Sequence, residues 1–528
     1  MKKVVTIIIL CLIATWPFFK KGYFESHDGE WMVIRFSAFH QTLRDGQFPV
    51  RFVDRLNNNY GYPVLNFLYP LPFYLAEIPK VLGFGFVDSI KIVFVISTVT
   101  SALVAYWAFS QVFSVYASLA GAILYLFIPY RFVDLYVRGS LGENLAFAII
   151  PLILGCIFKI ARGERIFLAV LAISVSLLIV SHNVIAILFL PLFIIISLIL
   201  IKKKKEVTLA FVLGILVSTF FWLPAIYDLQ YVRLSQIKVS NIQDHLVGPL
   251  QLIIPSWGYG PSPNGQNPLP VQIGIVALAS FVFAFYLRFA NKIKDLLLDL
   301  MLLVFILVFF LITKISLLFW QNVPFADIIQ FPWRMLSILV FISSFLIAYV
   351  VNANKKQIVL AVIIVLASII STIVYTKPAV FVDRGDGFYS TNEDSTTVRD
   401  EYLPLWVQDK PASRANQKIE IINGDAQINQ SLIRPAVYQA TITALTDSKI
   451  QINTIYFPGW QVKVDSQNVP ISYQNRYGLI TFDLPAGEHK VIINYARSPV
   501  HLISEIISLM ALVATGIFFY SLWRKQNS

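Results

Sequence analysis

The sequence predicts a polytopic α-helical membrane protein of about twelve transmembrane helices, with a β-sandwich-like domain inserted before the last helix. Three observations predict it: twelve apolar segments, basic residues gathered on one side of them, and one late stretch of alternating apolar and polar residues. A transmembrane helix needs about 20 mainly apolar residues. The segments approach this length with their flanks and comprise residues 4–18, 92–109, 115–128, 145–160, 166–180, 184–201, 207–223, 271–287, 296–312, 335–351, 358–375 and 502–522.

The first segment could also be a secretory signal. No clear cleavage site of small residues precedes Phe18-Phe19-Lys20-Lys21, and eleven further apolar segments follow, which favours a retained first helix. The two cysteines, Cys11 and Cys156, lie inside apolar segments and predict neither a disulfide framework nor a zinc site.

Basic residues indicate the orientation, because short loops rich in Lys and Arg stay in the cytoplasm. The basic clusters at 2–3, 159–165, 202–205, 288–294, 355–356 and 524–525 all fall on one side of the twelve segments. We therefore expect a multi-pass protein of the cytoplasmic (inner) membrane with both termini in the cytoplasm. The net charge of +12 largely reflects these loops, so no nucleic-acid partner is expected.

The large polar connections, at 20–91, 224–270 and 376–501, fall on the other side. The predicted organisation is a transmembrane domain (1–375) with outer loops 20–91 and 224–270, an extracytoplasmic β-rich domain (376–501), and a last helix with a cytoplasmic tail (502–528). Residues 62–82 are apolar but are interrupted by prolines and by Glu77 and Lys80. We expect an interfacial or re-entrant element there rather than a span.

The β-sandwich is predicted from the pattern between about 417 and 495. Short alternating stretches such as KIQINTIYF, WQVKVD and GLITFDL are separated by turn sequences that include Asn423-Gly424 and Pro458-Gly459. Strands at this spacing are typical of a small sandwich.

Two carboxylates, Asp28 and Glu30, follow the first apolar segment directly. A carboxylate at the membrane surface can take a proton from an acceptor hydroxyl or bind a divalent metal. The alternative is that both merely solvate the start of a loop.

Arginines are the second candidate group. The first outer loop holds Arg35, Arg44, Arg51 and Arg55, which could clamp the phosphate or diphosphate of a lipid, or could pair with Asp45 and Asp54 instead.

Shorter outward connections add further polar residues at the membrane boundary, where they tend to face the bundle or a water-filled cavity. These residues are Arg138, Glu143, His182, Asn183 and Arg334. Arg138 and Arg334 could face a bound anion, with Glu143, His182 and Asn183 in support. Alternatively, His182 is a structural hydrogen-bonding residue, and Trp333 with Arg334 is an interfacial anchor. The sequence contains no phosphate-binding glycine loop, Ser/His/Asp motif or zinc spacing.

Several motifs together resemble a known family. HDGEWM, LRDGQFPVRF, NNNYGYPVLNFLYPLPFYL, YVRGSLGENLA, SHN, QFPWRM, EYLP (401–404) and YFPGWQVKVD occur in an order and spacing that resemble the 6-pyruvoyl-tetrahydropterin synthase-related bacterial membrane proteins. That family is similar in architecture to the GT-C glycosyltransferases. The zinc-binding histidines of a pterin synthase are absent from this sequence.

The resemblance implies a GT-C-like fold and an enzyme that moves a sugar from a polyprenyl-phosphate donor to an extracytoplasmic glycan, lipid or protein acceptor. It implies that Asp28 is the base or the ligand of a divalent metal (Mg or Mn), with Glu30 as a nearby second carboxylate. Arginines of the outer loops would then hold the donor phosphate.

Two other function classes remain open. A transporter or flippase of lipid-linked envelope precursors would place ionisable residues near mid-membrane in broken helices, whereas these spans are nearly free of charge. The other alternative is an inactive envelope-assembly scaffold whose β-domain binds polymer.

Overall fold

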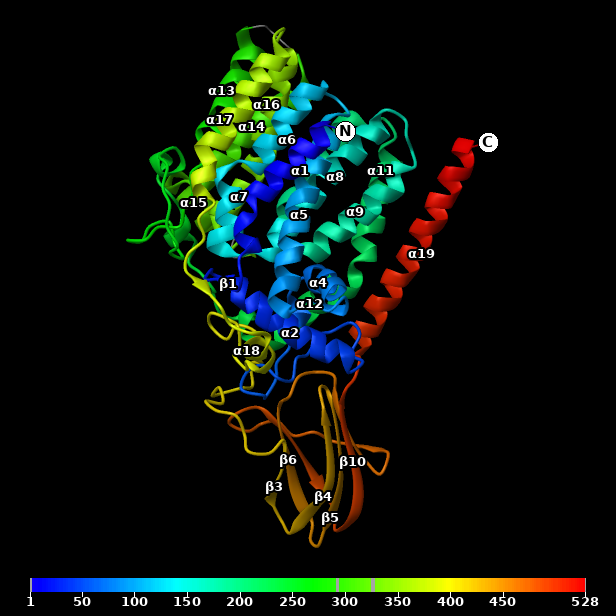
Figure 1. Cartoon of the computed structure of the whole chain (residues 1–528). Coiled ribbons are helices and arrows are strands. Elements are labelled where there is room, and N and C mark those ends of the chain that lie inside the picture. Colours follow the sequence, from blue (N-terminus) through cyan, green and yellow to red (C-terminus); the bar gives the residue numbers. More distant parts are fainter. Residues whose placement is uncertain (1, 291–293, 324–327, 528) are drawn as a thin grey trace.

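A computed structural model describes residues 2–290, 294–323 and 328–527 of the 528-residue chain, so Lys292 of one basic cluster and Asp327 lie outside the described residues. The molecule has a helical part and a β-sandwich attached to one end of it (Figure 1). Both termini lie at the opposite end of the helical part.

Each predicted apolar segment forms a helix or a bent pair of helices. They are α1 (Lys2–Ala14), α5 (Phe86–Phe109), α6 (Val115–Leu126) with α7 (Pro129–Val133), α8 (Leu141–Ala161), α9 (Phe167–Ser181), α10 (Asn183–Leu200), α11 (Lys204–Val217) with α12 (Thr219–Asp228), α13 (Ile275–Ala290), α14 (Leu296–Ile312), α16 (Leu336–Ala353), α17 (Gln357–Thr372) and α19 (Pro499–Asn527).

The protein is a multi-pass membrane protein, but the count of twelve spans is not confirmed. Among the described residues, six helices are long and apolar enough to cross a membrane, or up to eight if each bent pair is one span. The α6–α7 pair bends by 42° and the α11–α12 pair by 62°. Helices such as α9, with 15 residues, reach only about 22 Å at 1.5 Å per residue, against a hydrocarbon core of about 30 Å.

The centre of the helical part is formed by α5, α6, α8 and α16, which pack against one another. The apolar sequence of α8 continues round the whole helix, and its spanning stretch is 83% buried, as a helix without a polar face requires. In contrast, α19 runs along the outside of the bundle (Figure 1).

The first polar loop, residues 20–91, folds as β1 (Tyr23–Phe24), α2 (Gly29–Arg44), α3 (Val64–Phe67) and α4 (Leu71–Val81). Neither α3 nor α4 reaches spanning length, in agreement with the prediction for residues 62–82. Strand β1 pairs antiparallel with β2 (Phe381–Val382), and α18 (Asp386–Thr391) packs on α2. Residues 376–417 therefore cover the first polar loop.

The sandwich occupies residues 419–495. One sheet has the order β3 (Ile419–Asn423), β6 (Ser448–Ile455) and β9 (Leu479–Leu484). The other has the order β4 (Ala426–Arg434), β5 (Val437–Ala444), β10 (Gly487–Tyr495), β7 (Trp460–Val464) and β8 (Gln467–Val469). The alternating apolar residues face the space between the sheets. Phe52 and Phe67 of the first polar loop join the same core, which fixes the sandwich to the helical part.

Candidate functional site

A cavity of about 580 Å³ lies where the helices meet the polar loops, within the size range of ligand pockets. Its walls come from α2, from the turns after α7 and α9, from the turn before α16, and from residues 239–245 and 398–402. The polar and aromatic residues that line it include His27, Asp28, Trp31, Arg35, Tyr69, Arg138, His182, Asn183, Asp244, His245, Gln330, Arg334, Arg399, Glu401 and Tyr402. Five predicted site residues, Asp28, Arg138, His182, Asn183 and Arg334, thus share one cavity.

Backbone contacts hold Asp28 against Arg138. The backbone N–H groups of His27 and Asp28 donate to the carbonyls of Val137 and Arg138, at 3.0 and 2.8 Å. The chain can approach so closely because Gly139 has a φ of 64°, and a Cβ there would lie 2.5 Å from Ser26 Oγ. The glycine of the Arg-Gly-Ser sequence therefore joins two parts of the site that lie far apart in the chain.

The side chain of Asp28 is partly exposed at the N-terminus of α2. It makes no hydrogen bond or ion pair with any described residue, whereas neighbouring carboxylates such as Glu30 are paired. The carboxylate is therefore available to accept a proton from a ligand in the cavity.

Arg138 is buried beside the cavity, with 3% of its side chain exposed. Its Nη1 donates to Asp134 Oδ1 (2.8 Å), to the Tyr130 hydroxyl (3.3 Å) and to Glu143. Neither Nε nor Nη2 donates to a described residue, so both remain for a ligand. Glu143, itself fully buried, does not line the cavity; it accepts from Arg138 and from Tyr130 (2.6 Å) and so positions the arginine.

Arg334 is the second cation of the cavity. Its Nη1 donates to Gln330 Oε1 at 3.0 Å, and its guanidinium lies 4.7 Å from the ring centre of Phe331. Its Nε is buried and lacks a partner among the described residues. Its Nη2 is not fully buried and makes no hydrogen bond to a described residue, so Arg138 and Arg334 together can donate to an anion in the cavity.

His182 offers an uncharged donor. Its Nδ1 accepts from the backbone N–H of Ile185 (3.2 Å), so the proton of the neutral ring is on Nε2. Burial, with a smaller contribution from Arg334 and Arg138, lowers the pKa of His182 to about 3 against the opposing effect of Glu143. The ring stacks on Tyr69, with centroids 4.9 Å apart. Asn183, the next residue, is exposed.

Glu30, Arg55 and Arg51, which were predicted as site residues, lie away from this cavity. Glu30 accepts from Arg384 (3.0 Å) and from the Tyr389 hydroxyl (3.1 Å), and so points toward α18. Arg55 donates to Ser37 (2.7 Å) and to the Tyr389 carbonyl (3.1 Å), which ties α2 to α18. Neither side chain faces the Asp28 cavity, because both are engaged in attaching residues 384–390 to the first polar loop.

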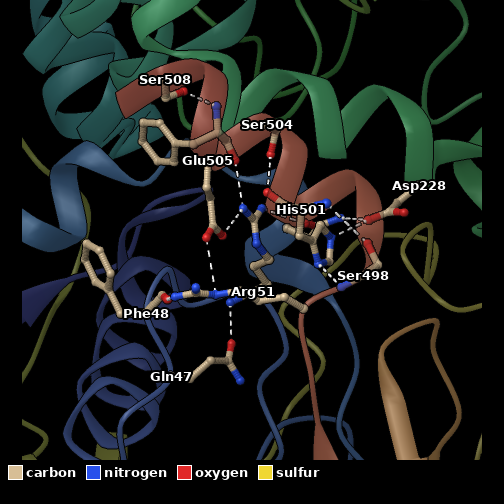
Figure 2. Close-up of polar contacts among 12 residues, drawn as sticks. Gln47, Phe48, Arg51, Asp228, Ser498, His501, Ser504, Glu505 and Ser508 are labelled. Atoms are coloured by element: carbon tan, nitrogen blue, oxygen red, sulfur yellow. Dashed lines mark hydrogen bonds and ion pairs between the residues drawn. The ribbon is translucent and has the colours of Figure 1, made fainter. Parts of the chain in front are cut away.

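Arg51 belongs to a different cluster, at the start of α19. Figure 2 shows Glu505 of α19 directed at the Arg51 guanidinium and His501 directed at Asp228. Arg51 donates to the Phe220 carbonyl (2.8 Å) and to Glu505 Oε1 (3.3 Å), and the His501–Asp228 pair is 3.1 Å apart and almost fully buried. Arg51 thus attaches the last helix to the first polar loop.

The carboxylates that line the cavity are those of Asp28, Asp244 and Glu401. Among the described residues, no group of three or more His, Cys, Asp or Glu side chains could hold a metal ion. Mg²⁺ is commonly bound by one or two carboxylates together with substrate phosphates, so a metal ligated by Asp28 stays a prediction.

Arg35, one of the arginines considered for an anion clamp, also lines the cavity, whereas the sequence prediction did not include Trp31 and Glu401 among the site residues. Trp31 follows Asp28 by three residues, the spacing of one helical face, so the helical period alone could have pointed to it. Glu401 lies in the EYLP motif, where no local signal indicates that it reaches α2.

No protein-family model and no curated protein matches the chain, so the resemblance to the 6-pyruvoyl-tetrahydropterin synthase-related family has no support from either comparison. Solved structures give partial likenesses. The arabinofuranosyltransferase AftD from Mycobacteria is 14% identical at a TM-score of 0.47, over 73% of this chain and 28% of that protein.

Two structures from Archaeoglobus fulgidus also match in part. They are an oligosaccharyltransferase in the apo form and the oligosaccharyltransferase AglB with an inhibitory peptide and a dolichol-phosphate. They are 12% and 13% identical, at TM-scores of 0.40 and 0.39, over 73% and 74% of this chain and 56% of each of those chains. The chain thus spans between about a quarter and just over half of the length of these proteins. Because every TM-score lies below 0.5, the likenesses carry no weight in assigning a function.

Proposed function

We propose that the protein is a membrane glycosyltransferase of the GT-C type, which moves a sugar from a polyprenyl-phosphate-linked donor to an extracytoplasmic glycan, lipid or protein. One observation carries this proposal: the carboxylate of Asp28 and two arginines line a single cavity, and in the described part of the chain neither the carboxylate nor some of the arginine N–H groups have a hydrogen-bond partner. A free base beside an anion site is what transfer from a phosphate leaving group requires.

The reaction follows from these positions. The acceptor hydroxyl gives its proton to Asp28 while its oxygen bonds to the anomeric carbon of the donor sugar. The bond between that carbon and the phosphate oxygen breaks, and the electron pair leaves with the polyprenyl phosphate. Arg138 and Arg334 stabilise the negative charge that develops on the leaving group, and His182 Nε2–H can donate one further hydrogen bond.

A lipid-linked donor has to reach the cavity with its tail still in the bilayer, and the location of the cavity between the helices and the polar loops supports such an approach. We place this face outside the cytoplasm; the one-sided basic loops and the position of both termini away from the sandwich support that orientation. In a cysteine-free variant, a cysteine at Asp465 should be labelled by an impermeant reagent from outside, and one at Lys203 should not. Labelling at Lys203 from outside would reverse the orientation.

The bent helix pairs favour transport as a second candidate. Flippases and transporters use broken helices that carry buried ionisable residues, and the α6–α7 pair bends by 42° and is followed by buried Asp134 and Arg138.

A reconstituted assay separates the candidates. Purified protein in nanodiscs is given a library of polyprenyl-phosphate and polyprenyl-diphosphate sugars, and free polyprenyl phosphate or diphosphate is measured with and without acceptors. Acceptor-dependent release supports the transferase. In liposomes, movement of a fluorescent lipid-linked sugar without release supports the flippase, and neither activity points to the inactive scaffold.

A further inference from the structure

A second, smaller cavity of about 250 Å³ adjoins the Asp28 cavity. Its lining includes Trp31, Asn57, Asn58, Asp394 and Lys410. Trp31 borders both cavities. A second link is made by Arg35 of the first cavity, whose Nε donates to the Thr396 hydroxyl of the second at 3.1 Å. The two spaces are therefore separated by only a few side chains.

Asn57 is the unusual residue of this second cavity. Its side chain is 1% exposed, yet neither Oδ1 nor Nδ2 has a hydrogen-bond partner among the described residues. A buried amide left unpaired is costly, and buried polar groups in proteins are nearly always satisfied. Asn57 borders a cavity, so a ligand in that cavity can supply the missing partners.

The backbone around Asn57 is also held in an uncommon conformation. Asn57, Asn58 and Asn59 have φ values of 59°, 55° and 65°, and Thr396 across the cavity has a φ of 56°. A β-branched residue rarely adopts such a φ. Its hydrogen bond to Arg35 holds Thr396 in this conformation.

The chemistry of the lining fits a neutral saccharide. The Asn57 amide offers donors and an acceptor side by side, which matches hydroxyl groups that both donate and accept. Asp394 is exposed and adds acceptor oxygens, while the charge of Lys410 is already paired with Asp400 at 2.6 Å. Trp31 supplies an aromatic wall of the kind against which an amphipathic ring can pack.

We propose that this second cavity binds a hydroxyl-rich saccharide of the acceptor and presents it to Asp28. This inference rests on the proposed function. Trp31 follows Asp28 by three residues on α2, so the two side chains lie on the same side of that helix. An acceptor bound at Asn57 therefore extends past Trp31 toward the base.

Binding can be measured apart from turnover. Saturation-transfer NMR on the full-length protein in lipid nanodiscs, which lack sugar headgroups, would use linear hexasaccharides of glucose, mannose and N-acetylglucosamine as probes. We expect at least one probe to bind. Asn57→Gly, which tolerates the positive φ, should weaken that binding by about tenfold because the amide hydrogen bonds are lost. Asn59→Gly is the matched control: Asn59 has a similar positive φ but does not border the cavity. This substitution should change binding by less than about twofold.

Two results would overturn the inference: wild-type protein that binds none of the probes, or equal losses in Asn57→Gly and Asn59→Gly. Asp28→Asn separates the inference from the proposed function, because it should keep saccharide binding while transfer is lost. If no transfer is found at all but binding depends on Asn57, the proposed function fails and the saccharide site stands. Where transfer is found, Asn57→Gly should raise the acceptor KM and leave the donor affinity unchanged.

Discussion

Replacing Asp28 by asparagine tests the proposed mechanism most directly. The substitution keeps the size and the helix-capping ability of the side chain but removes the base. A general base typically contributes about 10²–10⁴-fold to the rate, so the barrier should rise by roughly 2.7–5.4 kcal/mol. Because the carboxylate makes no hydrogen bond to a described residue, the free energy of unfolding should change by less than about 0.5 kcal/mol.

The chain supplies a matched control in Glu30→Gln. Glu30 lies two residues further along α2, but it bonds to Arg384 and Tyr389 instead of lining the cavity. Its loss should lower the thermal stability slightly and leave turnover nearly normal. The assay is release of polyprenyl phosphate at saturating donor, together with a donor titration, in which Asp28→Asn should bind donor at least as well as wild type. Near-normal turnover of Asp28→Asn, or an equal loss in both variants, would refute the assignment.

Three further outcomes are expected. In a donor titration, Arg334→Ala should weaken donor binding by about 1.5–3 kcal/mol, or roughly 10- to 150-fold in Kd. As its control, Arg51→Ala should leave the donor Kd unchanged but lower the Tm measured by thermal unfolding. In the unfolded chain His182 binds a proton below about pH 6.5, whereas in the folded protein it stays neutral down to about pH 3. Because the unfolded state binds the extra proton, this residue should lower the free energy of unfolding of the wild type by roughly 1.5 kcal/mol as the pH falls from 6.5 to 5. In His182→Asn, denaturant unfolding at the two pH values should lack that fall; an unchanged fall would contradict it. Gly139→Ala should separate Asp28 from Arg138, because the added Cβ sits on a residue with positive φ and collides with Ser26. Both the Tm and the turnover should fall. Wild-type values of both would show that the close approach is unnecessary.

The apolar pattern predicts where the helices lie but not how many of them cross the bilayer. Residues 296–312 were predicted as one helix and form α14 with those bounds. Residues 207–223 were predicted as one span but bend by 62° around Ser218. The bend was not predicted, because a straight helix and a bent helix can have the same apolar pattern. The number of spans depends on such bends and on helix length, which hydropathy alone does not report.

Candidate residues could be selected from the sequence where polar residues stand beside apolar segments. Asp28, Arg138 and Arg334 all do, and all line one cavity. Arg51 and Arg55 carry the same local signal but are engaged elsewhere. Some of the partners that engage them, such as Glu505 for Arg51 and Tyr389 for Arg55, lie hundreds of residues away in the chain and cannot be paired with them by spacing. A single sequence shows that an arginine is present but not what it contacts.

The pairing of β1 with β2 and the bond from Arg35 to Thr396 have a consequence for biosynthesis. Arg35 and Thr396 are 361 residues apart, so a ribosome working at about 5–20 residues per second finishes the second roughly 20–70 s after the first. During that interval the cavity residues that have already been synthesised lack the wall that residues 398–402 later provide. A nascent chain, or one truncated before residue 396, therefore holds Arg35 without its Thr396 partner.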